Sequence, residues 1–119
     1  MTPTDTAPAL SDQVRALLTD KPSGELPMTY QQVARALGLE PPRTIQRVAQ
    51  AIEQLMDEDV AAGRPMIAAL VVSRRNDLPA EGFFEHAVAL GRFPADPEQY
   101  EALYTTERER ALRFRGPSR

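Results

Sequence analysis

Apolar residues along this chain recur mainly every three or four positions, the period of an amphipathic helix. One run, Met66–Val72, is instead short and almost continuously apolar, as in a buried strand. The pattern predicts a last helix that begins at Asp96–Pro97 and has Tyr100, Leu103 and Tyr104 on its buried side. The pattern predicts earlier helices over Leu10–Thr19, Tyr30–Leu37, Pro42–Ala62 and Phe83–Leu90.

Local signals predict where these helices begin and end. Thr29 followed by Gln32 forms a capping box, in which the hydroxyl and the amide each satisfy a free group of the helix start. Gly38 suits the left-handed residue after the last turn of that helix, and Gly63 ends the long one. Ser11 or Asp12 is the expected cap of the first helix.

A short capped helix, a turn and a longer helix together are typical of a helix-turn-helix. With the following strand they predict a mainly α (α+β) fold, a winged-helix-like domain with a short strand and an extra C-terminal helix. The 119 residues suit one domain, which we place at 10–115 between flexible tails at 1–9 and 116–119.

Composition excludes several classes of function. Cysteine is absent, which excludes disulfides, thiolate metal sites and cysteine nucleophiles. No apolar run reaches the roughly 18 residues of a membrane span, and Met1–Leu10 lacks the features of a signal peptide. We therefore expect a cytoplasmic protein without a membrane partner. The net charge of −3 argues against wholesale coating of nucleic acid.

The local charge differs from the overall charge. The segment Met28–Ala51 contains three arginines and a single acid, Glu40, so its net charge is +2. Arginine suits phosphate and guanine, glutamine suits adenine edges, and hydroxyls suit phosphate. The acidic run Asp57–Asp59 would repel phosphate, so only the first half of the long helix could enter a groove. The residues expected to contact double-stranded DNA are Thr29, Tyr30, Arg35, Arg43, Gln46, Arg47, Gln50, Arg74 and Arg75.

The residue types that commonly act in catalysis or bind metals form no recognisable site in this sequence. His86, the only histidine, lies near Asp77, Glu81 and Glu85, but one imidazole among scattered carboxylates is more typical of a surface residue than of a metal ligand. The acidic run Asp57–Asp59 is expected to be solvated. There is no Ser-His-Asp spacing, phosphate loop or dinucleotide fingerprint. We expect a non-enzyme without cofactor or metal, whose aromatic residues Phe83, Phe84, Tyr100 and Tyr104 belong to the core.

Three segments resemble a known family. MTYQQVARALGL, PPRTIQRVAQAI and RPMIAALVVSRRNDLPAEGFF, spanning Met28–Phe84, are similar to the DNA-binding domain of O6-alkylguanine-DNA alkyltransferases and alkyltransferase-like proteins. The resemblance implies a winged helix and places Tyr30 on a phosphate-contacting tyrosine. It places Gln46 on the arginine that fills the gap left by a flipped base.

The same resemblance excludes the family's chemistry. It places Ala68, Ala69 and Leu70 on the cysteine, histidine and arginine of the P-C-H-R-V motif. Alkyl transfer needs a thiolate, so a non-catalytic DNA-binding protein, regulatory or repair-related, is the expectation. The segment ALVVSRRNDLPAEGFF also looks like stretches of uncharacterised bacterial winged-helix proteins. The alternative is a protein–protein interaction module on the same scaffold, docking through Tyr100–Phe114 or Glu53–Asp59.

Overall fold

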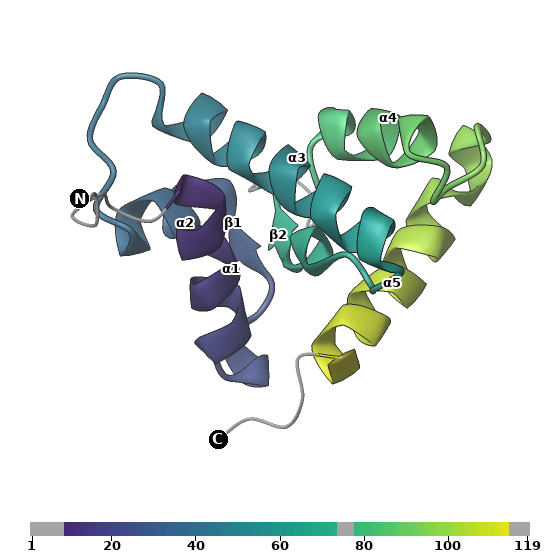
Figure 1. Ribbon diagram of the computed structural model, residues 1–119, viewed down its shortest axis with the longest axis horizontal. Coiled ribbons are helices and arrows are strands. Elements are labelled where there is room, and N and C mark those ends of the chain that lie inside the picture. Colours follow the sequence, from purple (N-terminus) through teal and green to yellow (C-terminus); the bar gives the residue numbers. More distant parts are fainter. Residues whose placement is uncertain (1–8, 74–77, 115–119) are drawn as a thin grey trace, which may run out of the picture.

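A computed structural model describes residues 9–73 and 78–114. Within these residues, five α-helices surround a minimal sheet (Figure 1). The helices are α1 Leu10–Asp20, α2 Tyr30–Ala36, α3 Thr44–Ala62, α4 Glu81–Ala89 and α5 Tyr100–Phe114. Single 3-10 turns are η2 Ser23–Glu25, η3 Ile67–Leu70 and η4 Pro97–Gln99, and the strands are β1 Met28–Thr29 and β2 Val71–Val72.

Helix α3 is the element around which the others are arranged. It crosses the molecule with α1 and α2 on one side and α4 and α5 on the other (Figure 1). Its inward positions form one stripe along the helix, because a step of about 100° per residue returns them to the same face. They pack into a hydrophobic core shared with α1, α2, α4 and η3: Val48, Ala51, Ile52, Leu55 and Met56.

The sheet joins two distant parts of the chain. Strands β1 and β2 run parallel, with Met28 opposite Val71 and Thr29 opposite Val72. The predicted strand at Met66–Val72 is therefore only partly right, since Ile67–Leu70 form the turn η3. The cause is tertiary: the N–H groups of Met66 and Ile67 donate to carboxylates of α5 and α3, at 2.7 and 2.9 Å. Only the last two residues pair as a strand.

The helix ends confirm some of the local signals and correct others. The Thr29 hydroxyl accepts from the Gln32 N–H at 3.1 Å, and the Gln32 side chain accepts from the Thr29 N–H at 2.8 Å, as predicted. Gly38 and Gly63 take positive φ, also as predicted. The cap of α1 was predicted wrongly, because Ala9 occupies that position and offers no side-chain acceptor.

The start of α3 also differs from the prediction. The helix begins at Thr44 instead of Pro42. Arg43 has φ 65° and ψ 28°, a left-handed conformation that cannot be part of a right-handed helix. The residues between α2 and α3 are consequently more numerous than the roughly three or four of a tight helix-turn-helix.

Aromatic side chains close the core between α4 and α5, as predicted. Phe84 stacks on Tyr100 with ring centroids 4.9 Å apart. Phe83 meets Tyr104 edge to face at 6.0 Å, and Phe93 joins the cluster. Such pairs contribute beyond the apolar area that they bury.

The mainly α fold with a small sheet is confirmed. In the described part of the chain, β1 precedes α2 and β2 follows α3, and these two strands pair with each other. The winged-helix arrangement stays a prediction. None of the described helices combines the length and hydropathy that a membrane span requires.

Candidate nucleic-acid interface

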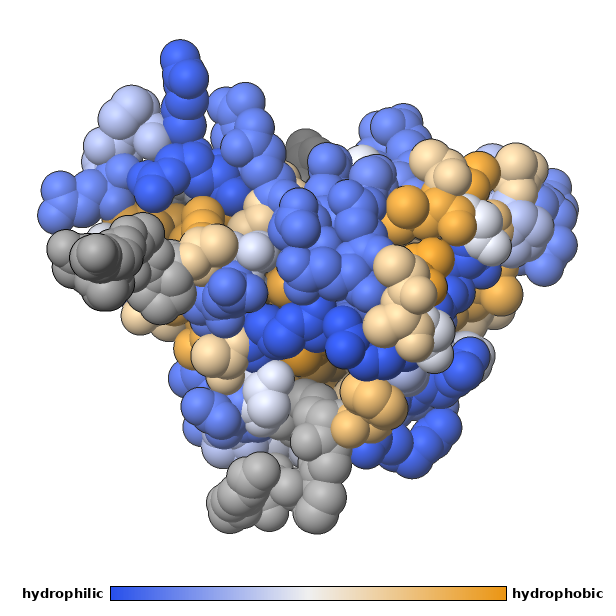
Figure 2. Space-filling model, viewed as in Figure 1, coloured by the Kyte–Doolittle hydropathy of each residue, from blue (hydrophilic) through white to orange (hydrophobic). Residues whose placement is uncertain are grey.

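The first half of α3 presents a polar surface to solvent. Gln46, Arg47 and Gln50 are exposed on the side of the helix opposite the core stripe, and the cap residue Arg43 just before the helix is exposed as well. We call these four residues the α3 face. Hydrophilic surface runs along α3 in Figure 2, whereas apolar surface gathers over the far end of α4 and the segment leading to α5. The same periodicity that buries Val48 and Ile52 thus brings Gln46, Arg47 and Gln50 together.

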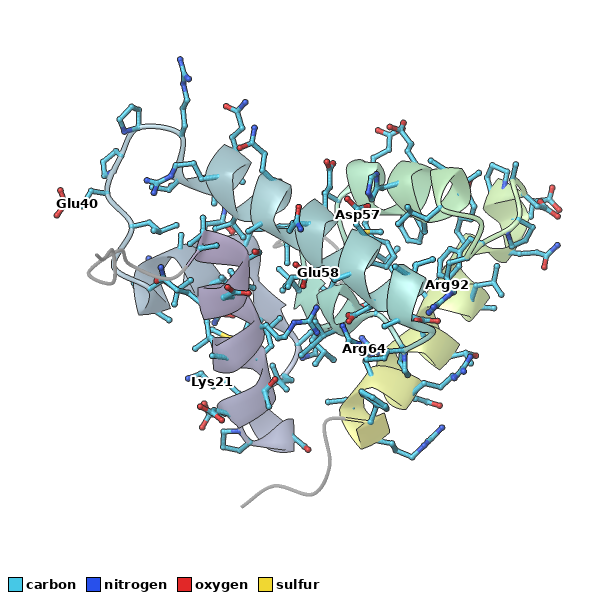
Figure 3. All side chains as sticks on the ribbon, in the orientation of Figure 1. Lys21, Glu40, Asp57, Glu58, Arg64 and Arg92 are labelled. Atoms are coloured by element: carbon cyan, nitrogen blue, oxygen red, sulfur yellow. The ribbon has the colours of Figure 1, made fainter. Side chains whose placement is uncertain are left out.

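The arginines of the α3 face have no partner within the described residues: neither Arg43 nor Arg47 forms an ion pair or a hydrogen bond through its guanidinium there. Three other arginines are occupied, since Arg15, Arg64 and Arg92 each bind a carboxylate at 2.7–3.0 Å. Glu40, the one acid of the basic segment, projects from the loop before α3 and away from the rest of the molecule (Figure 3). The charge of the α3 face is therefore available to a ligand.

Arg35 is exposed but lies elsewhere. It belongs to α2 and lines a groove of about 420 Å³ together with Lys21 and Gln32. A separate groove borders the α3 face, and its lining residues do not include Arg35. The structure does not bring Arg35 together with the α3 face.

Thr29 and Tyr30 serve the fold. The Thr29 hydroxyl is engaged in the capping box of α2. Tyr30 is only 6% exposed, and its hydroxyl oxygen accepts from the Ala80 N–H at 3.1 Å. Burial raises the pKa of Tyr30 above its ordinary value, and the nearby Glu53 carboxylate adds to the shift. Direct phosphate contact by Tyr30 would require it to leave the core.

Two of the residues expected to contact DNA, Arg74 and Arg75, lie outside the described residues.

The family resemblance placed Ala68, Ala69 and Leu70 on a catalytic motif, and all three are buried in η3. Ile45, in the first turn of α3, is 38% exposed although it is a large apolar residue.

The second half of α3 is acidic, and its charges are largely used within the molecule. Glu58 accepts from Gln54 at 3.1 Å and from Arg15 at 3.0 Å (Figure 3). These hydrogen bonds, that of Gln54 first, lower the pKa of Glu58. Burial opposes the charge on Arg15, but its bonds to Glu58 and Asp59 outweigh this and raise the pKa of Arg15. Asp57 meets His86 Nε2 of α4 at 2.7 Å.

The expectation that the acidic run is solvated is wrong for Asp59, which is 1% exposed. Its Oδ1 accepts from Arg15 at 2.9 Å and from Arg64 at 3.0 Å, and its Oδ2 accepts from the Ile67 N–H at 2.9 Å. The sequence does contain a signal: Asp59 follows Val48, Ile52 and Leu55 on the same apolar stripe. A carboxylate at a core position needs buried donors.

A second buried carboxylate anchors α5. Glu107 accepts from the Met66 N–H and from Arg92, both at 2.7 Å. Arg92 also donates to the Arg64 carbonyl at 2.9 Å. The charged end of the chain is thus less uniformly exposed than its sequence indicates. Among the described residues, no group of three or more histidine, cysteine, aspartate or glutamate side chains is placed to hold a metal ion.

Comparison with known proteins adds no family assignment. No family model matches the chain, and no curated protein or solved structure matches it either. The alkyltransferase resemblance of Met28–Phe84 therefore stays an expectation.

Proposed function

We propose that this protein binds double-stranded DNA, without catalysis, through the α3 face. One observation carries the proposal: Arg43 and Arg47 are exposed and unpaired within the described residues, and two exposed glutamines lie between and beside them. Arginines that serve the fold here are bound to carboxylates. Cations left without an internal partner are suited to an external anion.

The chemistry of the α3 face fits a nucleic acid. Guanidinium groups bind phosphate oxygens or the O6 and N7 edge of guanine, and glutamine can pair with adenine. The first turn of α3 also carries the positive end of the helix dipole. Glu53, Asp57 and Glu58 follow further along the helix, so DNA would contact its first half and leave the second half outside the groove.

The test measures affinity for a random-sequence duplex by fluorescence anisotropy as salt is varied from about 50 mM, where electrostatic binding is strong. Arg43→Gln and Arg47→Gln should each weaken binding and reduce the slope of log K against log salt by about one. Arg110→Gln is the matched control, because Arg110 is an exposed arginine of α5. Absence of duplex affinity at low salt, or an equal effect of all three variants, would reject the proposal.

A protein partner is the second candidate, and one observation favours it. Phe114 at the end of α5 is 59% exposed and lines a groove of about 250 Å³. The groove's other lining residues are partly apolar and partly polar or charged: Pro65, Ile67, Ala111, Arg15, Thr19, Asp59 and Arg64. Aromatic residues are enriched at protein interfaces. Photo-reactive phenylalanine analogues at positions 47 and 114 separate the two functions. Cross-links to DNA from position 47 support the first, and cross-links to protein from position 114 alone support the second.

A further inference from the structure

We propose that a groove between the first turn of α1 and the middle of α3 binds one backbone phosphate of the DNA. The inference rests on the proposed function and assigns a specific contact within it. The groove has a volume of about 480 Å³. Its lining residues come from two elements: Ala9, Leu10, Ser11 and Asp12 at the start of α1, and Arg47, Gln50, Ala51, Gln54 and Glu58 on α3.

The start of α1 offers free donors. The first N–H groups of a helix have no partner within the helix. A capping side chain commonly binds one of them, but Ala9 at the cap position makes no such bond. These groups and the helix dipole favour a negative charge at this end.

Ser11 is the second, independent feature. It lines the groove, it is 8% exposed, and its hydroxyl has no hydrogen-bond partner in the part of the chain that the structure describes. A buried hydroxyl without a partner is costly, so such groups are normally bonded. A ligand oxygen in the groove would accept this hydrogen bond.

The α3 side supplies charge and selectivity. Arg47 contributes the cation, and Gln50 adds an amide donor. Of the two acids in the lining, Glu58 is already bound by Arg15 and Gln54, whereas no ion pair of Asp12 occurs among the described residues. Because the groove borders the α3 face, DNA lying on that face would pass its backbone over it. Helices that flank a recognition helix contact the backbone in the same way.

Asp12 provides the sharpest test, because its negative charge would repel a phosphate in the groove. Asp12→Asn should tighten duplex binding roughly 2- to 5-fold, because it removes one repulsive surface charge. Asp20→Asn is the matched control: Asp20 is also exposed on α1, but at the opposite end of the helix. Loss of an acid from the first turn destabilises a helix, so tighter binding by Asp12→Asn cannot arise from a firmer fold.

A second measurement observes the groove itself. In amide NMR spectra, the resonances of residues 10–12 should move on addition of a short duplex. Ser11→Ala should weaken binding roughly 3- to 10-fold, whereas Thr106→Ala, an exposed hydroxyl loss on α5, should not. A parallel titration with inorganic phosphate at constant ionic strength distinguishes a free anion from the DNA backbone.

The outcomes separate the two proposals. If the duplex binds but Asp12→Asn equals Asp20→Asn and residues 10–12 do not respond, the groove contact is refuted while the proposed function stands. A response to inorganic phosphate and not to duplex also refutes it. If the wild-type protein has no duplex affinity, both the proposed function and the groove contact are refuted.

Discussion

At the scale of single residues, Asp59 shows how a charge can serve as a core residue. Its two oxygens receive donors from α1, from the segment after α3 and from η3, so one carboxylate holds three elements together. A buried ion is tolerated only when hydrogen bonds and opposite charges replace its hydration. Asp59 therefore belongs to the core of the fold, unlike the exposed Glu53 of the same helix.

Replacing Asp59 should be costly. Asp59→Ala removes the acceptor of Arg15 Nη1, of Arg64 Nε and of the Ile67 N–H, and breaking a buried pair in this way costs roughly 3–5 kcal/mol. Urea unfolding followed by circular dichroism measures this loss. Asp57→Ala is the control, because Asp57 is an exposed neighbour whose pair with His86 is worth about 0–1 kcal/mol. Similar losses for the two variants would show that Asp59 is solvated after all.

Tyr30 gives a prediction that depends on pH. Tyr30→Phe removes the acceptor of the Ala80 N–H and should cost about 1 kcal/mol at pH 7. Burial raises the pKa of Tyr30 in the folded protein above the ordinary value near 10. Its stabilising effect is therefore complete below about pH 10 and is lost as the pH rises through the folded-state pKa.

The difference between wild type and Tyr30→Phe should accordingly narrow above about pH 10 in urea unfolding experiments. Duplex affinity, measured on the folded proteins at pH 7, should be the same for both, because this hydroxyl faces Ala80. A large loss of affinity in Tyr30→Phe would restore the tyrosine as a phosphate contact.

At the scale of elements, the capping box makes the start of α2 self-sufficient. Thr29→Ala should cost about 1 kcal/mol, the usual effect of losing such a cap. Thr29→Ser keeps the acceptor and should recover most of the loss. Thermal unfolding of both variants tests this, and equal midpoints would mean that the hydroxyl is not needed.

Elements were predictable where local rules decide them. Periodicity predicted the helices, and the Thr29–Gln32 pair predicted the start of α2 because both partners lie within one turn. The strand at Met66–Val72 was only partly right, since Asp59 and Glu107 capture the first N–H groups of that run. The left-handed Arg43 was missed for a related reason, because nothing in its own side chain favours that conformation.

The candidate site likewise has a part that local sequence patterns predict and a part that depends on tertiary packing. Gln46, Arg47 and Gln50 share a surface because helical geometry alone places them there, whereas Arg43 precedes them as the left-handed cap residue of α3. The burial of Tyr30 depends on packing against Ala80, fifty positions away in the chain, which no local pattern reveals. The groove beside α1 needs the docking of α1 on α3, so Ser11 was visible in the sequence only as a possible cap.

At the scale of the whole molecule, charge is distributed unevenly over an acidic chain with a net charge of −3. The arginines of the α3 face lie at one end of α3, and the arginines that hold the fold together meet carboxylates around its other end (Figure 3). An approaching polyanion responds to the local charge at short range, because salt at about 0.1 M screens interactions beyond roughly 10 Å. Position, and not net charge, should therefore determine the affinity for DNA.

Two variants that change the net charge equally test this. Glu53→Gln removes an exposed acid of α3, two helical turns from Gln46, and Glu98→Gln removes an exposed acid of η4. At about 0.1 M salt, Glu53→Gln should tighten duplex binding roughly 2- to 5-fold, the effect of one surface charge. Glu98→Gln should leave the affinity unchanged. Equal tightening would mean that the duplex responds to the charge of the whole protein, and the α3 face would then have no special place in binding.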